Sequence, residues 1–496
     1  MKKEKSSKYG LLKVLGISFL VFAVLSWIIK AGSYSGSTYT ADATSPVGLY
    51  GLFIDPLYSF GIFVQYIVVF LAIGGLYGIL NKTGVYSKMV EGISNKFKNK
   101  KTLFLIITII TFALLSSLVG SQIALFIFVP FVIAILMSLG YDKITSLAAT
   151  VGSIIVGVIG STYGTGVVFK SFFAMSANNG ILYKAILFVI VVALYIFFIL
   201  GKEKLNAKKE VVEEVKPKKG KKKVEKVLEK VTEKVKKVEI PLYDDNKDDR
   251  KNAIPLVIMF SLLALIVLVG MFNWYYTFDI EFFNKIYESI MSVEVGGVAI
   301  FAKIFGELPQ IGSFGNYDLA AILIIATCLI AWVYGIKFND FVESYKNGAK
   351  KMLLPAIYVM FASIIFAVMV NSNTNISATI TNFLLGLTDK FNALIVTLVG
   401  LVSSYFFNDF PYMVNSLYGA LSTYDANMYP IISIILNATY GLAMLILPVS
   451  ITLIAGLKYM DVSYKEWFKY IWKFLLQVFV LIILFFVSNN ISFSVS

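Results

Sequence analysis

A single carboxylate falls inside a stretch of sequence that the apolar pattern places in a membrane. Asp409 lies between two apolar runs, and no other acidic residue is predicted at that depth. A charged side chain in the bilayer is costly, and it therefore marks a functional site by default. Its carboxylate can bind an ammonium or guanidinium group, bind Na⁺ or carry a proton. The alternative is a solvated, structural carboxylate at the mouth of a hairpin.

Small polar residues interrupt the apolar runs at four places, two in each half of the chain. Serine pairs end two of the runs, and two further runs are broken at residues 160–166 and 437–441, the second also containing Pro448 and Ser450 further along. Unwound backbone at membrane depth is tolerated only where it is buried in protein or lines a cavity. Such residues also occur at ordinary helix contacts, but their matched positions favour a binding site. The predicted substrate-binding residues are Ser116, Ser117, Gly160, Ser161, Thr162, Ser403, Ser404, Asp409, Asn437 and Thr439.

The elements that must position these residues are membrane-spanning helices. Of the 496 residues, 58% are hydrophobic and only 15% are charged, whereas soluble chains average ~25% charged residues. Apolar runs near the ~20 residues that cross a bilayer recur along the chain. The sequence therefore predicts an all-α polytopic membrane protein, with nine full spans and re-entrant hairpins within residues 103–139 and 392–422.

The composition excludes several kinds of chemistry. The chain has no histidine and a single cysteine, Cys328, which rules out His-based catalysis, an internal disulfide and Cys-rich metal sites. It contains no phosphate-binding loop of the G-x-x-x-x-G-K-[ST] type. The net charge of +14 comes almost wholly from lysine, with Arg250 the only arginine, and does not indicate nucleic-acid binding. We expect no enzymatic activity, no catalytic residues, no cofactor and no metal site.

The lysines predict the orientation in the cell membrane, because loops rich in Lys and Arg stay in the cytoplasm. The N-terminus carries four lysines within its first eight residues, and a second cluster lies between Lys82 and Lys101. Residues 31–57, between the first two spans, carry no Lys or Arg. The N-terminus is therefore predicted in the cytoplasm and the C-terminus outside. The first apolar run lacks a small-residue cleavage site and is predicted to be a retained span.

A basic segment at residues 202–252 divides the chain into two membrane regions, 1–201 and 253–496. Between residues 221 and 239, valines and a leucine at helical spacing form one stripe among charged residues. This pattern predicts either a solvated linker helix or a helix that lies on anionic lipid headgroups.

The two membrane regions repeat each other. Residues 81–97 align without gaps on residues 375–391, with four identical pairs. A hairpin and a broken span then follow in the same order in each region, and the lysines place the two hairpins on opposite sides. The prediction is two inverted repeats with re-entrant hairpins and discontinuous helices, plus a linking span at residues 253–273. This is the architecture of secondary transporters.

Six short motifs outside the basic segment stand out: Leu139–Asp142, Gly157–Ser161, Asn347–Pro355, Leu447–Ser450, Ala455–Lys458 and Val462–Trp467. They resemble the ion transporter superfamily, in particular its YfcC-like and DcuC-type anaerobic dicarboxylate carrier branch. The resemblance implies two hairpins and two broken helices around a central site. The sequence departs from it at residues 123–124, which are Ile-Ala where these carriers tend to have a Glu pair, and at residues 163–164, which are Tyr-Gly where Asn-Pro often follows.

These features predict a secondary active transporter for a small organic solute rather than a channel, a membrane scaffold or a membrane-embedded enzyme. The YfcC-like resemblance implies amino acid transport. Basic amino acid exchange of the arginine/ornithine type is the main hypothesis, because Asp409 offers a partner for a positive charge. The DcuC-type resemblance implies a C4-dicarboxylate as the alternative, with Lys170 as an anchor for the anion. Antiport or coupling to Na⁺ or H⁺ would supply the energy. Related carriers are commonly dimers, so the resemblance also implies a homodimer.

Overall fold

The protein is an all-α polytopic membrane protein. The computed structural model describes residues 9–41, 46–215, 239–306, 308–371 and 375–493. Within these ranges seven helices are long and apolar enough to cross a membrane, or eight if α17 (Phe338–Ala362) and α18 (Ile364–Asn371), which meet at 44°, form one bent span. The other candidate spans lie in α1 (Gly10–Ile28), α2 (Gly51–Thr83), α3–α4 (Tyr86–Val119), α10 (Ile181–Val215), α12 (Ile254–Met271), α16 (Asn316–Val333) and α24 (Tyr464–Phe493).

The first half contains a helical hairpin followed by a broken helix. A short helix, α3 (Tyr86–Phe97), and the turn η1 (Lys98–Lys100) precede hairpin 1, which consists of α4 (Lys101–Val119), α5 (Gln122–Phe126) and α6 (Val129–Ser138). The next span is built from α7 (Lys143–Leu147), the π-helical turn η2 (Ala148–Gly152) and α8 (Ser153–Ile159). It stops at Gly160 and resumes as α9 (Gly166–Phe173), so residues 160–165 form break 1, as the sequence predicted.

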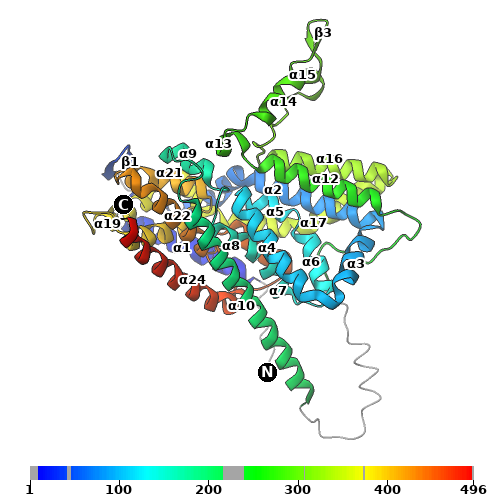
Figure 1. The fold of residues 1–496 in the computed structure, drawn as a ribbon, viewed down its shortest axis with the longest axis horizontal. Helices are drawn as coiled ribbons and strands as arrows, with labels where there is room; N and C mark the ends of the chain where they lie inside the picture. The colour runs from blue at the N-terminus through cyan, green and yellow to red at the C-terminus, as the bar shows by residue number, and fades with distance from the viewer. Residues whose placement is uncertain (1–8, 42–45, 216–238, 307, 372–374, 494–496) are drawn as a thin grey trace.

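The second half repeats this order. A short helix, α19 (Ile376–Leu385), precedes hairpin 2, which consists of α20 (Ala393–Phe406) and α21 (Phe410–Leu421). After the turn η3 (Ala426–Met428), α22 (Tyr429–Met444) and α23 (Ile451–Met460) form the second broken span. Figure 1 shows α3 and α19 at opposite sides of the molecule, as inverted repeats require. The predicted alignment is offset by several residues, because Asn81 lies inside α2 whereas Asn375 is the N-cap of α19.

The second break does not lie where the sequence predicted it. Helix α22 continues through residues 437–441, and the interruption falls at residues 445–450, which we call break 2. Pro448 explains the position, since proline has no N–H to donate and disfavours helical backbone in the residue before it. The carbonyls of Leu445 and Ile446, freed by the break, accept hydrogen bonds from the side chains of Trp467 and Tyr464 on α24.

Close helix packing builds the rest of the membrane body. Helix α17 packs along α2, and the contact is made of glycines: a Cβ on Gly74 or Gly348 would overlap the backbone of the facing helix. Small residues let membrane helices approach closely and gain dispersion energy. Two short antiparallel pairs complete the structure, β1 (Gly32–Ser35) with β2 (Thr38–Ala41) and β3 (Glu294–Val295) with β4 (Val298–Ala299).

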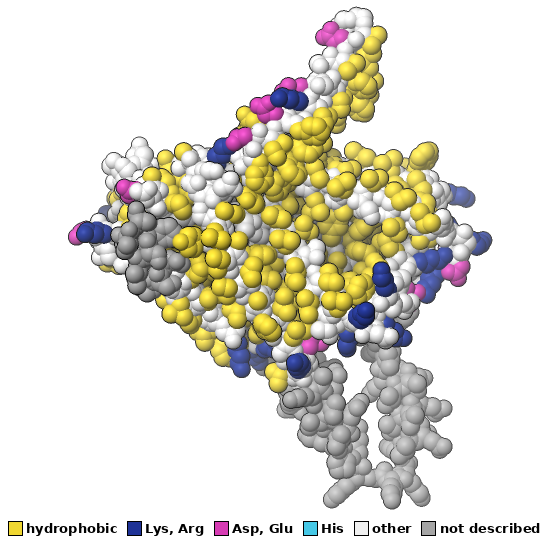
Figure 2. Space-filling view, in the orientation of Figure 1, with side chains coloured by type: hydrophobic (Ala, Val, Ile, Leu, Met, Phe, Trp, Pro, Cys, Tyr) yellow, Lys and Arg dark blue, Asp and Glu magenta, His cyan; other side chains and the backbone are white. Residues whose placement is uncertain are grey.

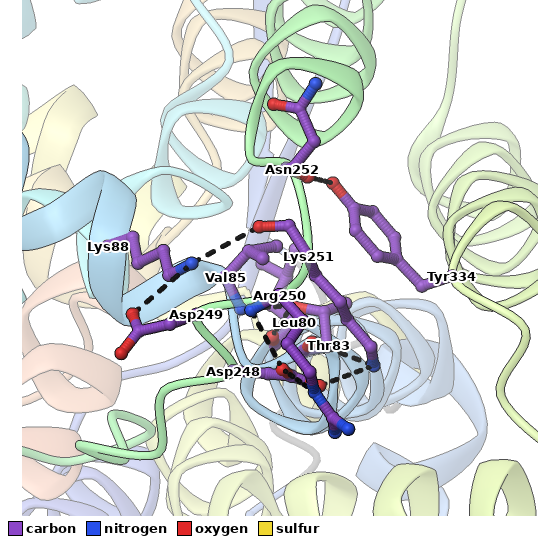
Figure 3. A network of polar contacts seen from close by, with 10 residues as sticks. All are labelled: Leu80, Thr83, Val85, Lys88, Asp248, Asp249, Arg250, Lys251, Asn252 and Tyr334. Atoms are coloured by element: carbon purple, nitrogen blue, oxygen red, sulfur yellow. Dashed lines mark hydrogen bonds and ion pairs between the residues drawn. The ribbon is translucent and has the colours of Figure 1, made fainter.

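The end of the predicted linker is tied to α2 and α3. Asp248 N donates to Gly84 O (2.9 Å), and Lys88 forms an ion pair with Asp249 (3.5 Å). Figure 3 shows the ion pair between Lys88 and Asp249, and the hydrogen bond that Lys251 Nζ donates to Thr83 O (3.2 Å). A hydrogen bond from Arg250 lowers the pKa of the Asp248 carboxyl. The linker therefore ends at a fixed position against the membrane body, whereas the predicted amphipathic helix at residues 221–239 lies outside the described residues except for its last residue.

Candidate functional site

Both hairpin tips and both helix breaks meet around one cavity of about 520 Å³. Its size falls within the range of pockets that bind small molecules. Helices α2, α12 and α16 complete the wall, partly through the pair formed by Asn316 Nδ2 and Gln65 Oε1 (3.1 Å). The polar lining residues are Gln65, Tyr66, Ser116, Ser121, Gln122, Ser161, Thr165, Asn316, Asn408, Asp409, Tyr440, Ser450 and Thr452.

Hairpin 1 is fastened to break 1 by the residue before its tip. The backbone carbonyl of Ser117 accepts hydrogen bonds from the N–H groups of Thr162 (3.2 Å) and Gly164 (2.9 Å). The Ser117 hydroxyl accepts from Thr162 N (3.0 Å) and lies 3.2 Å from Gly160 O, to which it donates. Gly120 follows with φ +76°, and a Cβ there would overlap the backbone of Gly164. The backbone groups of Gly160, Thr162 and Gly164 that break 1 exposes are thus paired inside the protein, as membrane depth requires.

Hairpin 2 is held at its tip by different partners. Tyr440 on α22 donates its hydroxyl to Asn408 O (2.8 Å), and Asn408 Nδ2 donates to Ser363 Oγ (2.8 Å) at the kink between α17 and α18. The next residue, Asp409, is the N-cap of α21, and its carboxylate accepts from Tyr412 N (3.2 Å). The structure places this carboxylate in the cavity wall.

The predicted site residues fall into three groups. Ser116, Ser161 and Asp409 line the cavity, and the hydroxyl of Ser116 has no hydrogen-bond partner among the described residues. Ser117, Gly160 and Thr162 form the junction between hairpin 1 and break 1. The remaining four, Ser403, Ser404, Asn437 and Thr439, are buried and do not line the cavity.

Two of these four are satisfied within their own helices. Ser404 Oγ donates to Gly400 O (2.6 Å), and Thr439 Oγ1 donates to Ile435 O (2.8 Å). They lie where α20 packs on α22, and Thr439 abuts Gly400. These two residues therefore face a contact between helices, and the cavity wall includes none of the four.

Several lining residues were missed from the sequence. Gln65, Tyr66 and Asn316 lie on helices that the hydropathy pattern identified only as spans, and nothing in their local sequence marks them. Ser450 and Thr452 carried a usable signal, since a proline followed by a serine before an apolar run predicts a helix start. Ser450 is the N-cap of α23, and its hydroxyl accepts from Leu453 N (3.4 Å).

Four helices of eight residues or more begin at the cavity wall. They start beside Thr165 (α9), Gly315 (α16), Asp409 (α21) and Ser450 (α23). The shorter α5 also begins there, at Ser121. A helix N-terminus presents unpaired N–H groups and a partial positive charge, so it favours anions. The lining residues include no Lys or Arg, and Asp409 is the charged member of the lining.

Two lysines near this region have different environments. Lys170 on α9 forms an ion pair with Asp279 (2.8 Å) and does not line the cavity, so the predicted role as an anion anchor is not supported by its position. Lys184 on α10 is buried, with 2% of its surface exposed. Its Nζ lies 5.5 Å from the ring centroid of Phe169, and that ring lies 5.9 Å from the ring of Phe410 in the cavity wall. The ring of Phe169 thus lies close both to the buried Lys184 and to Phe410, the first residue of α21.

Comparison with known protein families agrees with a carrier. The sequence model of the family described as "DcuC: C4-dicarboxylate anaerobic carrier" matches residues 61–411. No curated protein matches the chain. Among solved structures, the chain is similar to the Alcanivorax borkumensis YdaH transporter, with 13% identity over 95% of this chain and 97% of that one and a TM-score of 0.38.

Proposed function

The chain belongs to the DcuC family of C4-dicarboxylate anaerobic carriers, and from this premise we propose that it carries a C4-dicarboxylate such as succinate through the cavity between the two hairpins. The protein is a membrane transporter of this family with multiple membrane-spanning helices. The match supports the dicarboxylate that the sequence had suggested as its alternative, rather than the amino acid of the main hypothesis.

The observation that carries the proposal is the convergence of helix N-termini on a cavity without a lysine or arginine. Helices α9, α16, α21 and α23 start at its wall. Each helix start is equivalent to about half a positive charge. Backbone N–H groups at these starts would bind the two carboxylates, and hydroxyls such as those of Ser116 and Thr165, which have no partner among the described residues, would add hydrogen bonds.

Asp409 needs a cation if a dianion is bound nearby. Its carboxylate would repel the substrate, and the described lining supplies no basic side chain to offset that repulsion. We infer that Asp409 binds the coupling ion, either as a proton or as Na⁺ held with nearby backbone carbonyls. Uptake of the dicarboxylate would then depend on the gradient of that ion. A cationic amino acid, by contrast, would pair with Asp409 directly and need no such ion.

The test is transport by the purified protein in proteoliposomes. We expect saturable uptake of radiolabelled succinate that requires an inward Na⁺ or H⁺ gradient and is inhibited by fumarate or malate but not by arginine. Ser161→Ala, in the cavity wall, should raise the concentration for half-maximal uptake about tenfold, the effect of losing one hydrogen bond to a charged ligand. Ser403→Ala, outside the cavity, is the matched control and should leave it unchanged. Uptake of arginine that succinate does not inhibit would contradict the proposal.

A further inference from the structure

A helical arm projects from the membrane body between two spans. We define the arm as residues 279–306, which include α14 (Phe282–Met291), the β3–β4 pair and α15 (Ile300–Phe305). Its root is the short helix α13 (Trp274–Phe278) after the end of α12, and the chain returns to the body at the start of α16. Lys170 on α9 anchors the root through its ion pair with Asp279 (2.8 Å). Figure 1 shows the arm extending beyond the body.

One side of the arm is apolar and exposed. Phe282, Ile286 and Ile290 recur at four-residue spacing along α14, with 61%, 38% and 45% of their surfaces exposed. On α15, Ile304 and Phe305 are 68% and 54% exposed. Figure 2 shows hydrophobic side chains along one side of the arm and charged side chains along the other.

The charged side of α14 carries Glu281, Lys285 and Glu288. These residues follow one another at helical spacing, and Lys285 forms an ion pair with Glu281 (2.8 Å). The hydrogen bond that Lys285 donates to Glu281 raises the pKa of Lys285, so this lysine stays charged at neutral pH. Helix α14 is therefore amphipathic, with a charged side suited to water and an apolar side that water does not favour.

The position of the arm indicates what covers the apolar side. Because α12 and α16 are candidate spans, their adjoining ends place the root of the arm at a membrane surface. The arm runs across the direction of the long helices α10 and α24 rather than along it. Its apolar side faces the side of the root on which α12 and α16 lie (Figures 1 and 2). An amphipathic helix in this position lies in the plane of the interface, with its apolar side among lipid headgroups and upper acyl chains.

We propose that the arm binds the surface of the lipid bilayer through Phe282, Ile286, Ile290, Ile304 and Phe305. The arm contains four acids and two lysines, so attraction to anionic headgroups does not hold it there. Burial of apolar side chains provides the binding, and the contact should form equally on zwitterionic and anionic membranes. A second copy of the chain is the other partner that an apolar surface of this kind could bind, and the experiment separates the two.

The test uses the full-length protein in nanodiscs that each hold one copy. Cys328 is replaced by serine, and the environment-sensitive fluorophore NBD is attached to Ile304→Cys or Phe282→Cys on the apolar side, or to Glu288→Cys on the charged side as the control. We expect NBD at 304 and 282 to emit at shorter wavelength, to be quenched by lipids with a nitroxide near the headgroup, and to resist aqueous iodide. NBD at 288 should show the reverse. Replacing a third of the phosphatidylcholine with phosphatidylglycerol should change neither result.

Two outcomes would overturn the proposal. Equal quenching by iodide at positions 304, 282 and 288 would show that the arm stands in water. Protection of positions 304 and 282 from iodide only in discs that hold two copies, without quenching by nitroxide lipids, would show that a second copy covers the apolar side. Using two apolar positions ensures that a local disturbance by one label does not decide the result.

Discussion

The two hairpin tips share a backbone design and differ in charge. In each hairpin the helix after the tip starts with a side-chain cap in the cavity wall: Ser121 Oγ accepts from Ala124 N (3.3 Å), and the Asp409 carboxylate accepts from Tyr412 N (3.2 Å). Hairpin 1 is fastened to break 1 through Ser117, whereas hairpin 2 is held by Tyr440 and Ser363.

The difference in charge leads us to propose different roles for the two tips. A neutral cap leaves the positive end of α5 uncompensated, while the carboxylate of Asp409 offsets that of α21 and can hold a cation. Under the proposed function, the tip of hairpin 1 would bind the anionic substrate and the tip of hairpin 2 the coupling ion. The fold repeats, but the electrostatics of the site do not. The predictions that follow test this comparison from the largest expected effect to the smallest.

The first prediction tests the inversion itself and has an all-or-none result. Lys98 and Asp389 occupy equivalent places in the two repeats. Lys98 lies between α3 and α4, and Asp389 lies between α19 and α20. In a Cys328→Ser background, Lys98→Cys should react with a membrane-impermeant maleimide only from the cytoplasmic side, and Asp389→Cys only from outside. Labelling of intact cells and of inverted vesicles measures both. Reaction of the two cysteines from one side would contradict opposed repeats, and the same assay tests the predicted cytoplasmic N-terminus.

The second prediction concerns the tight contact at the tip of hairpin 1. Gly120→Ala places a Cβ at φ +76° and against the backbone of Gly164. For an alanine, the left-handed conformation lowers the free energy of unfolding by about 1–2 kcal/mol. The overlap with Gly164 lowers it by about 1–3 kcal/mol more. We expect a large fall in the unfolding temperature and loss of succinate transport.

Gly140→Ala is the control, because Gly140 also has a positive φ (+90°) but has no atom within 4 Å of an added Cβ. Gly140→Ala should lower the free energy of unfolding by only the cost of the left-handed backbone, about 1–2 kcal/mol. This variant should retain transport. Equal behaviour of the two variants would show that hairpin 1 does not depend on contact with break 1.

Break 1 could be predicted from the sequence, and break 2 could not be placed correctly. Residues 160–166 contain three glycines in a short polar stretch, and no regular helix forms there. Asn437, Thr439 and Gly441 look similar, yet Gly441 lies against the backbone of Ile159 and Thr439 abuts Gly400. Small polar residues occur both in unwound segments and at close contacts between helices. Composition alone therefore does not show which of the two a given stretch forms. Pro448 was the decisive signal for break 2.

The residues that line the cavity could also be predicted only in part from the sequence. Residues of the hairpin tips and of break 1 were predictable because their segments interrupt apolar runs. Gln65 and Asn316 belong to uninterrupted spans and reach the cavity only through the packing of α2 and α16 around the hairpins. That packing depends on contacts such as Gly74 with Gly348, which are far apart in the chain. The convergence of four helix starts likewise becomes visible only in three dimensions.

The third prediction tests the charge of hairpin 2. Asp409→Asn keeps an N-cap, since Asn caps helices as well as Asp, but removes the carboxylate. We expect folding to be retained and the apparent affinity for the coupling ion to weaken about 10- to 100-fold, the effect of losing ~1.5–3 kcal/mol. Concentrative succinate uptake should fall accordingly, measured as a function of Na⁺ and of pH.

Asp425→Asn is the matched control, because Asp425 also caps a helical turn, accepting from Asn427 N (2.8 Å), but lies outside the cavity. It should leave the ion dependence unchanged. If Asp409→Asn shows wild-type affinity and ion dependence, its carboxylate is structural. If it instead loses binding of a cationic amino acid, the substrate assignment is wrong.

The smallest expected effect distinguishes the two serine pairs. The sequence treats Ser117 and Ser404 as equivalents, but Ser117 joins hairpin 1 to Thr162 and Gly160, whereas Ser404 bonds to Gly400 one turn earlier in its own helix. Ser117→Ala removes the hydroxyl that donates to the buried carbonyl of Gly160 in break 1, which should cost ~1–3 kcal/mol and weaken succinate binding a few-fold by loosening the wall at Ser161. Ser404→Ala should change stability by less than about 0.5 kcal/mol, because alanine is the better helix former. Thermal unfolding in detergent with and without succinate measures both effects. Because the two substitutions remove the same hydroxyl, equal losses would show that hairpin 1 is no more dependent on its break than hairpin 2, and the division of tasks between the tips would rest on Asp409 alone.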